Sequence, residues 1–278
     1  MKKNGLMAAA FAAALLGSPA AMAALFSFTT GSPDGLLGTA SRPDVGGKTE
    51  IESADDFTTT APATSLTSAT FTGLITGAGT LPAISDVVVE IYRIFPKDSN
   101  TARTPNVPSR ANSPSDVEFV GRDTAAGNLT FTTSILSTTF SAANSVLNGI
   151  NKSPNQTTNG EGPIRGLEVL FNVTFTDPIV LPADHYFFIP QVALPAGDEF
   201  YWLSAPKTIP APADLQSWIR NANLDPDWLR IGTDIISGSP APNFNASFSL
   251  TGTVPEPASL LLLLPALLLF ARLRRQGH

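Results

Sequence analysis

The side chains that could support acid–base or nucleophilic chemistry are few in this sequence. Its two histidines are His185 and His278, and it contains no cysteine. A Ser-His-Asp triad or a multi-histidine metal site needs more than this, because His278 lies in a terminal segment that we expect to be removed. His185 borders an apolar strand pattern, which indicates a structural role. No Gly-x-Ser-x-Gly elbow or Gly-x-x-x-x-Gly-Lys phosphate loop occurs.

Paired carboxylates are the catalytic set that remains, since glycosidases place two of them on either side of a sugar bond. Adjacent strand residues such as Asp55 and Asp56 point to opposite faces of a sheet, so they do not form such a pair. The sequence selects no other pair, and we therefore predict that the protein is not an enzyme; a glycan hydrolase ranks third among its functions. The carboxylates considered are Asp55, Asp56, Glu90, Glu168 and Glu199.

A calcium site is a weak candidate between residues 221 and 227. Asn221, Asn223, Asp225 and Asp227 stand two residues apart, as oxygen ligands do in a calcium loop. The glycine and glutamate that an EF-hand loop has at its sixth and twelfth positions are missing, and helix capping explains Asp225 more economically. We expect no metal and no other cofactor.

Three aromatic residues are candidates for stacking against sugar rings. Tyr186, Tyr201 and Trp202 lie in two aromatic-rich strand patterns, and aromatic faces of this kind bind glycans in carbohydrate-binding modules. Packing in the core is the role that we expect first for each of them, and also for Trp218 and Trp228, with sugar stacking as the alternative.

The N-terminal segment has the three parts of a secretory signal peptide. Lys2 and Lys3 precede an apolar run at residues 6–16, and Ala21 and Ala23 supply the small residues that a signal peptidase recognises. We predict cleavage after Ala23, so that residues 1–23 take no part in the fold.

The C-terminal segment, residues 254–278, has the form of a removable membrane signal. Val254-Pro255-Glu256-Pro257 precedes an apolar stretch at residues 260–271, which is shorter than a comfortable membrane span and is interrupted by Pro265. The basic residues after it would stay on the cytoplasmic side of an inner membrane. These are Arg272, Arg274 and Arg275.

Pro255-Glu256-Pro257, the apolar stretch and the arginine cluster together resemble the PEP-CTERM sorting signal of Gram-negative bacteria that make extracellular polysaccharide. The resemblance implies recognition by an exosortase, cleavage near the Pro-Glu-Pro motif and release to the outer surface or matrix. The body offers a second, looser resemblance. Its Glu52-Ser53-Ala54-Asp55-Asp56-Phe57 stretch is similar to the Ala-Asp-Asp-Phe opening of jelly-roll domains in exported bacterial proteins.

The composition of the body indicates an acidic β protein. Of the 17 Lys and Arg, five lie in the two terminal segments, whereas one of the 23 Asp and Glu does, which leaves 12 basic and 22 acidic residues in the body. This balance makes nucleic acid an improbable partner. The absence of cysteine excludes disulfides, even on a route through an oxidising periplasm. Frequent Thr, Ser, Asn, Gly and Pro favour strands joined by turns.

Alternation of apolar and polar residues predicts the strands. The clearest patterns are at 86–95, expected to be a central strand because both its faces are apolar, and at 167–176, expected to end at Asp177-Pro178. Residues 36–47, 96–115 and 151–162 are expected to be loops. The other predicted strands cover 25–30, 49–53, 56–60, 68–76, 116–122, 128–137, 185–193, 199–203 and 244–250.

One helical passage is expected, between Asp214 and Gly232. Asp214 would be its N-cap, with Leu215, Trp218 and Ile219 on one face at helical spacing. The predicted fold is therefore all-β, with residues 24–253 as one β-sandwich of jelly-roll type and a short helical insertion near 214–230; two β domains divided at 96–115 or 151–162 are the alternative. Further helices are expected in the signal peptide and in the C-terminal apolar segment.

These features predict an exported, non-enzymatic protein of the cell surface or extracellular matrix. Its expected partners are signal peptidase, an exosortase, the inner membrane in passing, and extracellular polysaccharide. A carbohydrate-binding module is the alternative function.

Overall fold

A computed structural model describes residues 23–77, 79–151, 157–206 and 215–255 of the chain. Within these ranges the protein is built of β-strands, with one six-residue π-helix, η1, at Ile231–Ile236. The strands are β1 (Ala24–Thr29), β2 (Leu37–Ala40), β3 (Ile51–Thr59), β4 (Thr64–Thr76), β5 (Asp86–Arg93), β6 (Val120–Asp123), β7 (Leu129–Ala142), β8 (Asn144–Val146), β9 (Ile164–Leu181), β10 (Asp184–Ala193), β11 (Glu199–Ala205), β12 (Trp218–Asn221), β13 (Leu229–Arg230), β14 (Asn245–Ala246) and β15 (Phe248–Val254).

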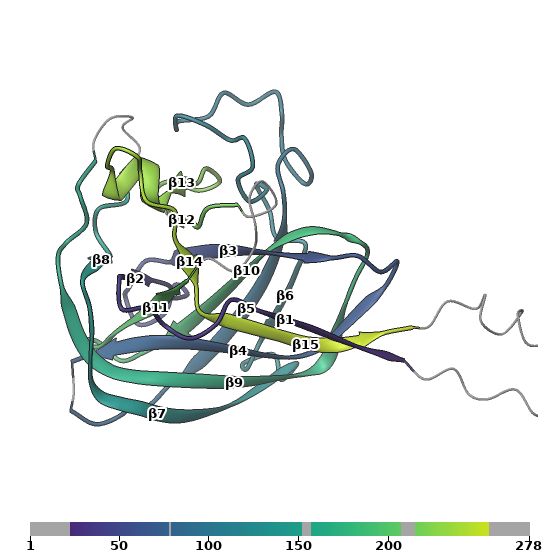
Figure 1. The fold of residues 1–278 in the computed structure, drawn as a ribbon, viewed down its shortest axis with the longest axis horizontal. Coiled ribbons are helices and arrows are strands. Elements are labelled where there is room, and N and C mark those ends of the chain that lie inside the picture. The colour runs from purple at the N-terminus through teal and green to yellow at the C-terminus, as the bar shows by residue number, and fades with distance from the viewer. Residues whose placement is uncertain (1–22, 78, 152–156, 207–214, 256–278) are drawn as a thin grey trace, which may run out of the picture. The chain divides into compact units, whose positions relative to one another are not determined.

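The strands form two sheets (Figure 1). One has the order β13-β12-β3-β10-β5-β6, so that β5 is an interior strand, as its two apolar faces predict. The other has the order β1-β15-β4-β11-β2-β8, with β9 also paired to β4, β7 paired to β9, and β14 paired to β11. The prediction of an all-β fold is confirmed.

The main hydrophobic core lies between the two sheets. Phe71 on β4, Phe171 on β9 and Phe248 on β15 meet Phe57 on β3 and Phe188 on β10 in one buried cluster. Phe71 stacks on Phe171 with 4.7 Å between ring centroids, and Phe188 stacks on Phe248 at 5.0 Å. Such pairs add to the burial of apolar surface, which is the dominant stabilising term of the fold. Residues Phe26–Gly252 form one compact unit.

The strand with the clearest alternation forms as predicted but continues further. In β9, Leu167, Val169, Phe171, Val173 and Phe175 are all buried. The strand was expected to end at Asp177-Pro178, yet it continues to Leu181. Its pairing with β4 shifts register between Leu66 and Ser68, which leaves residues 175–178 opposite a single β4 residue. A bulge of this kind absorbs a proline without ending the strand.

Three predicted boundaries in the first half of the chain are corrected. Residues 37–40, expected to be loop, form β2, which pairs in parallel with β8. The two short strands expected at 49–53 and 56–60 are one continuous strand, β3. The strand expected at 116–122 begins only at Val120.

The predicted helical insertion is wrong for the described residues, and Asp214 lies outside them. Trp218–Asn221 forms β12, which pairs with β3, and Leu229–Arg230 forms β13. Trp218 and Ile219 belong to different buried clusters, as neighbouring residues on opposite faces of a strand do. Between the strands, the Asn221 side chain accepts hydrogen bonds from the Asn223 and Leu224 amides and holds a turn instead of a helix start.

Candidate functional site

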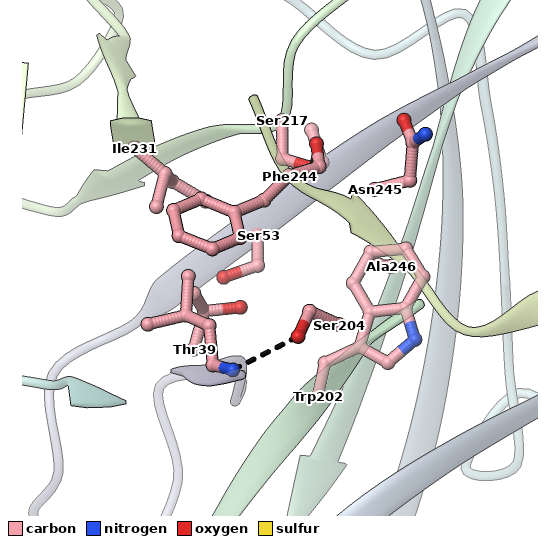
Figure 2. A pocket seen from close by; sticks show the side chains of 11 residues that line it. Thr39, Ser53, Trp202, Ser204, Ser217, Ile231, Phe244, Asn245 and Ala246 are labelled. Carbon is pink, nitrogen blue, oxygen red and sulfur yellow. Dashed lines mark hydrogen bonds between the residues drawn. The ribbon is translucent and has the colours of Figure 1, made fainter. Parts of the chain in front are cut away.

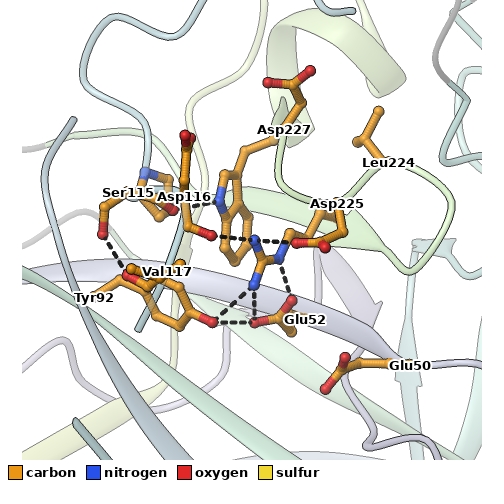
Figure 3. A network of polar contacts seen from close by, with 12 residues as sticks. Glu50, Glu52, Tyr92, Ser115, Asp116, Val117, Leu224, Asp225 and Asp227 are labelled. Atoms are coloured by element: carbon orange, nitrogen blue, oxygen red, sulfur yellow. Dashed lines mark hydrogen bonds and ion pairs between the residues drawn. The ribbon is translucent and has the colours of Figure 1, made fainter. Parts of the chain in front are cut away.

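A buried ion pair between Glu52 on β3 and Arg220 on β12 is the centre of the candidate site. The two residues face each other in the strand register. Arg220 donates from Nε and Nη2 to the two carboxylate oxygens, with 2.9 Å from Nη2 to Oε1. Tyr92 on β5 accepts a hydrogen bond from Arg220 Nη2 (2.8 Å) and donates one to Glu52 Oε1 (3.0 Å; Figure 3). This two-point contact is the strongest geometry that an arginine and a carboxylate can adopt.

The same guanidinium lies against aromatic rings and contacts the long loop between β5 and β6. Arg220 is 4.4 Å from the Trp228 ring centroid and 5.2 Å from that of Tyr92. Its Nη1 donates to the Asp116 carbonyl (3.3 Å) and pairs with Asp225 (2.8 Å), while Trp228 Nε1 donates to the Ser115 carbonyl (3.1 Å). The Arg220 guanidinium thus connects the outer face of the sheet to the β5–β6 loop and to the turn between β12 and β13.

A second arginine–carboxylate set fastens that loop at its other side. Asp227 is buried and accepts hydrogen bonds from Arg103 at 2.6 and 3.0 Å and from the Asn106 amide at 2.8 Å. Burial acts to raise the pKa of Asp227, but these hydrogen bonds outweigh it and hold the pKa below its usual range. Arg110 and Asp116 form a further ion pair within the loop. The loop expected at residues 96–115 is therefore held by charged contacts.

Proton affinities in the cluster are shifted in a consistent way. Burial raises the pKa of Glu90 on β5 to about 9, and the nearby negative charge and hydrogen bond of Glu52 act in the same direction. Burial and Glu52 also raise the pKa of Tyr92. Burial acts to lower the pKa of Arg220, but Glu52 outweighs it and raises that pKa. At neutral pH the cluster therefore holds a protonated Glu90.

The cluster places two carboxyl groups near each other, but the oxygens of Glu52 already have hydrogen-bond partners. A neutral carboxyl beside a carboxylate is a pairing that enzymes use for acid–base chemistry. Here both oxygens of Glu52 accept hydrogen bonds from Arg220, and one of them also accepts the hydrogen bond of Tyr92. Glu90 Oε2 is buried and has no hydrogen-bond partner among the described residues. The ion pair between Glu52 and Arg220 thus connects the sheet to the loop that covers it.

An open groove of about 680 Å³ lies next to this cluster. Arg220 and Tyr92 contribute to its wall, and residues of the loop between β5 and β6 supply most of the rest. Burial raises the pKa of Glu118 and of Glu50 at this wall, and the charge of Glu52 adds to the effect. The lining consists of Glu50, Tyr92, Asp98, Ser99, Asn100, Arg103, Asp116, Val117, Glu118, Arg220, Asp225 and Pro226.

Three of the four calcium candidates use their side chains for other contacts. Asn221 holds the turn, Asp225 pairs with Arg220, and Asp227 binds Arg103, while Asn223 donates its backbone N–H to the turn. Among the described residues no group of three or more His, Asp or Glu side chains is placed to hold a metal ion.

The three candidate glycan contacts are buried in the core, so they have the packing role that the sequence also predicted. Tyr186 is 1% exposed, Tyr201 6% and Trp202 1%. Trp202 Nε1 donates to the Ser247 carbonyl (3.0 Å), and its ring contacts Phe248 edge-on. Trp202 borders a cavity of about 10 Å³ between strands of both sheets (Figure 2), which is the space of a single water molecule. A sugar ring does not reach these side chains in this structure.

The carboxylates considered from the sequence are dispersed, and only Glu90 joins the cluster. Asp55 accepts hydrogen bonds from Ser217 Oγ (3.0 Å) and the Ala246 amide (2.8 Å), whereas Asp56 binds His185 Nε2 (2.6 Å). These contacts give His185 a structural role. Glu199 pairs with Arg42 and Lys48, and burial raises the pKa of Glu168.

Most of the sorting and processing residues lie outside the described ranges. Ala23, Val254 and Pro255 are described, and β15 ends at Val254. Ala21, Glu256, Pro257 and the three C-terminal arginines lie outside, as do the signal peptide and the apolar stretch at 260–271. In the described part of the chain, no helix is long and apolar enough to cross a membrane.

Comparison with known proteins gives no relative. No family model, no curated protein and no solved structure matches the chain.

Proposed function

We propose that this chain is an exported, non-enzymatic protein of the cell surface or extracellular matrix, which is held at the inner membrane by its C-terminal segment and released by cleavage there. The observation that carries the proposal is the order of Pro255-Glu256-Pro257, the apolar stretch and the arginines behind it. The end of β15 at Val254 supports it, since the motif begins where the last strand stops, and Pro255 is exposed. A protease needs an accessible, extended segment of this kind.

We further propose that the two-sheet body is a β-sandwich of jelly-roll type. The shared core between the sheets and the largely antiparallel pairing support this architecture. Its stability comes from apolar burial and buried ion pairs, because the chain has no cysteine. Such a body suits an extracellular location, where redox conditions vary.

The sorting proposal predicts that replacing Pro255, Glu256 and Pro257 with alanine keeps the protein at the membrane. In cells that contain signal peptidase and an exosortase, the unmodified chain is expected to lose both terminal segments and to reach the surface or medium. The triple variant is expected to lose only the signal peptide, because the protease no longer recognises its site. Intact mass and cell fractionation measure both results.

The matched control for this experiment is Pro195→Ala, a change of an exposed loop proline in the body. It is expected to be processed like the unmodified chain. Equal mass and equal location for the triple variant and the unmodified chain would contradict the sorting proposal.

A carbohydrate-binding module is the second candidate function, and the groove beside Arg220 favours it. Its wall of carboxylates, one amide and two arginines offers the donors and acceptors that sugar hydroxyls require. We predict that Glu118→Ala and Asn100→Ala each weaken glycan binding about tenfold, the effect of one lost hydrogen bond to a charged or well-placed group. A glycan array followed by calorimetry measures this, with Thr174→Ala on β9 as the control.

A further inference from the structure

Strand β7 is an unusually long exposed edge. It has 14 residues and pairs only with β9 in the described structure, and Figure 1 shows it as the outermost strand beyond β9. The other strands at sheet ends are short: six residues in β1, four in β6, three in β8 and two in β13. A long edge presents a row of backbone N–H and C=O groups that can bind another strand.

The features that normally prevent edge pairing are largely missing from β7. Natural edge strands are protected by charged side chains, especially lysine, by proline, or by bulges. From Thr124 to Asn151 the sequence has no Asp, Glu, Lys, Arg, His or Pro, although the whole chain contains 24 prolines and has a net charge of −6. Bulges occur only in the second half of β7, after Ile135.

The first half of β7 is a regular strand that is ready to pair. Residues 129–135 are in unbroken antiparallel register with residues 175–169 of β9. Thr130, Thr132 and Ser134 are exposed on one face, and Ile135 is 46% exposed on the other. Alternate residues of an antiparallel strand direct their backbone groups away from the partner that is already present, so this segment can hydrogen-bond on its free side.

We propose that β7 is a self-association edge, through which two copies of this chain pair antiparallel over residues 129–135 and make one sheet continuous across the dimer. A second copy is the occupant that the chemistry favours. The edge carries no charge that would select a partner of opposite charge, and two acidic chains meet here without placing like charges opposite each other. This pairing uses residues of the body only, so it does not depend on the sorting signal.

The register of the proposed dimer follows from placing its two-fold axis at the midpoint of residues 129–135. With the two-fold axis beside Thr132, the two copies of Thr132 lie opposite each other, Thr130 faces Ser134 of the second copy, and Phe131 faces Thr133. Threonine and aromatic–β-branched pairs are among the favourable cross-strand contacts. Because the regular segment is short, the dimer is expected to be weak and dependent on concentration.

Cysteine cross-linking tests this arrangement cleanly, because the chain contains no other cysteine. In the full chain in detergent under mild oxidation, Thr132→Cys is expected to give about tenfold more disulfide-linked dimer than Thr174→Cys, since only the former brings the two Cα atoms within disulfide range. Thr174 is exposed on β9 directly beside Thr130. Two copies of it would be about 20 Å apart across the proposed dimer, separated by three strand spacings sideways and by four residues along the strands. Equal cross-linking at positions 132 and 174 would overturn the proposal.

A charge at the edge gives a second, independent measurement. Thr132→Lys places two like charges opposite each other and is expected to abolish the concentration-dependent dimer in sedimentation equilibrium, whereas Thr174→Lys leaves it unchanged. Circular dichroism checks that both variants keep their strand content. A sedimentation result in which the unmodified chain is monomeric over the whole concentration range, or in which Thr132→Lys still dimerises, would also overturn the proposal.

Discussion

Replacing Arg220 with methionine is expected to lower the free energy of unfolding by about 3–5 kcal/mol, the usual cost of removing one partner of a buried ion pair. Methionine keeps much of the volume of the side chain but leaves the buried Glu52 carboxylate without its two-point donor. The cost is that of an unpaired buried charge, together with the lost contact on Trp228. Denaturant-induced unfolding, followed by tryptophan fluorescence, measures the change.

Two control variants separate this effect from a general loss of charge. Lys97→Met removes an ion pair with Asp184 in which Lys97 is 49% exposed, and it is expected to cost at most about 1 kcal/mol. The double variant Arg220→Met with Glu52→Leu is expected to recover most of the stability, because it removes both buried charges together. A single Arg220→Met variant as stable as Lys97→Met would show that the network does not stabilise the fold.

The ion pair also explains why the long loop between β5 and β6 can cover a sheet face. The guanidinium of Arg220 reaches the Asp116 carbonyl, and Trp228 reaches the Ser115 carbonyl, so the loop is bound to side chains that the sheet itself holds in place. Arg103 and Asp227 fasten its other part. Loosening Arg220 is therefore expected to release the wall of the groove as well.

The strands were predictable because their pattern is local. The alternation in β9 and the two apolar faces of β5 identify buried strands without knowledge of the partners. The insertion after residue 214 was not predictable in the same way, since Trp218 and Ile219 fit a helical face as well as opposite faces of a strand. Pairing with β3, more than 150 residues earlier in the chain, decides between the two.

The candidate site could not be assembled from the sequence for the same reason. Glu52 and Arg220 are separated by 168 positions, and Arg103 and Asp227 by 124. One signal was present: Arg220 directly follows the large apolar residues Trp218 and Ile219, and a charged residue that is buried with such neighbours needs a partner. Glu90, which sits among apolar residues in β5, gave the same signal and was considered only as a catalytic carboxylate.

Replacing Glu90 with glutamine is expected to make the protein more stable at alkaline pH and to leave it nearly unchanged near pH 4. Burial raises the pKa of Glu90 to about 9 from an ordinary value of 4.5. Below pH 4.5 both the folded and the unfolded chain carry the proton, so the contribution of this group to stability is fully present. Between pH 4.5 and 9 only the folded chain holds the proton, and stability falls as pH rises.

Glutamine is permanently neutral and can still donate a hydrogen bond to Glu52, so the variant does not lose stability in this way. We expect the free energy of unfolding of Glu90→Gln to exceed that of the unmodified chain by about 2–3 kcal/mol at pH 8, because only the unmodified chain must keep a proton on residue 90 in order to fold. Urea unfolding at pH 4, 6 and 8 measures the difference.

Glu168→Gln is the control, since burial alone raises the pKa of Glu168, and a change in stability of the same sign but smaller is expected. A difference for Glu90→Gln that is constant over these three pH values would mean that Glu90 is ionised in the folded protein.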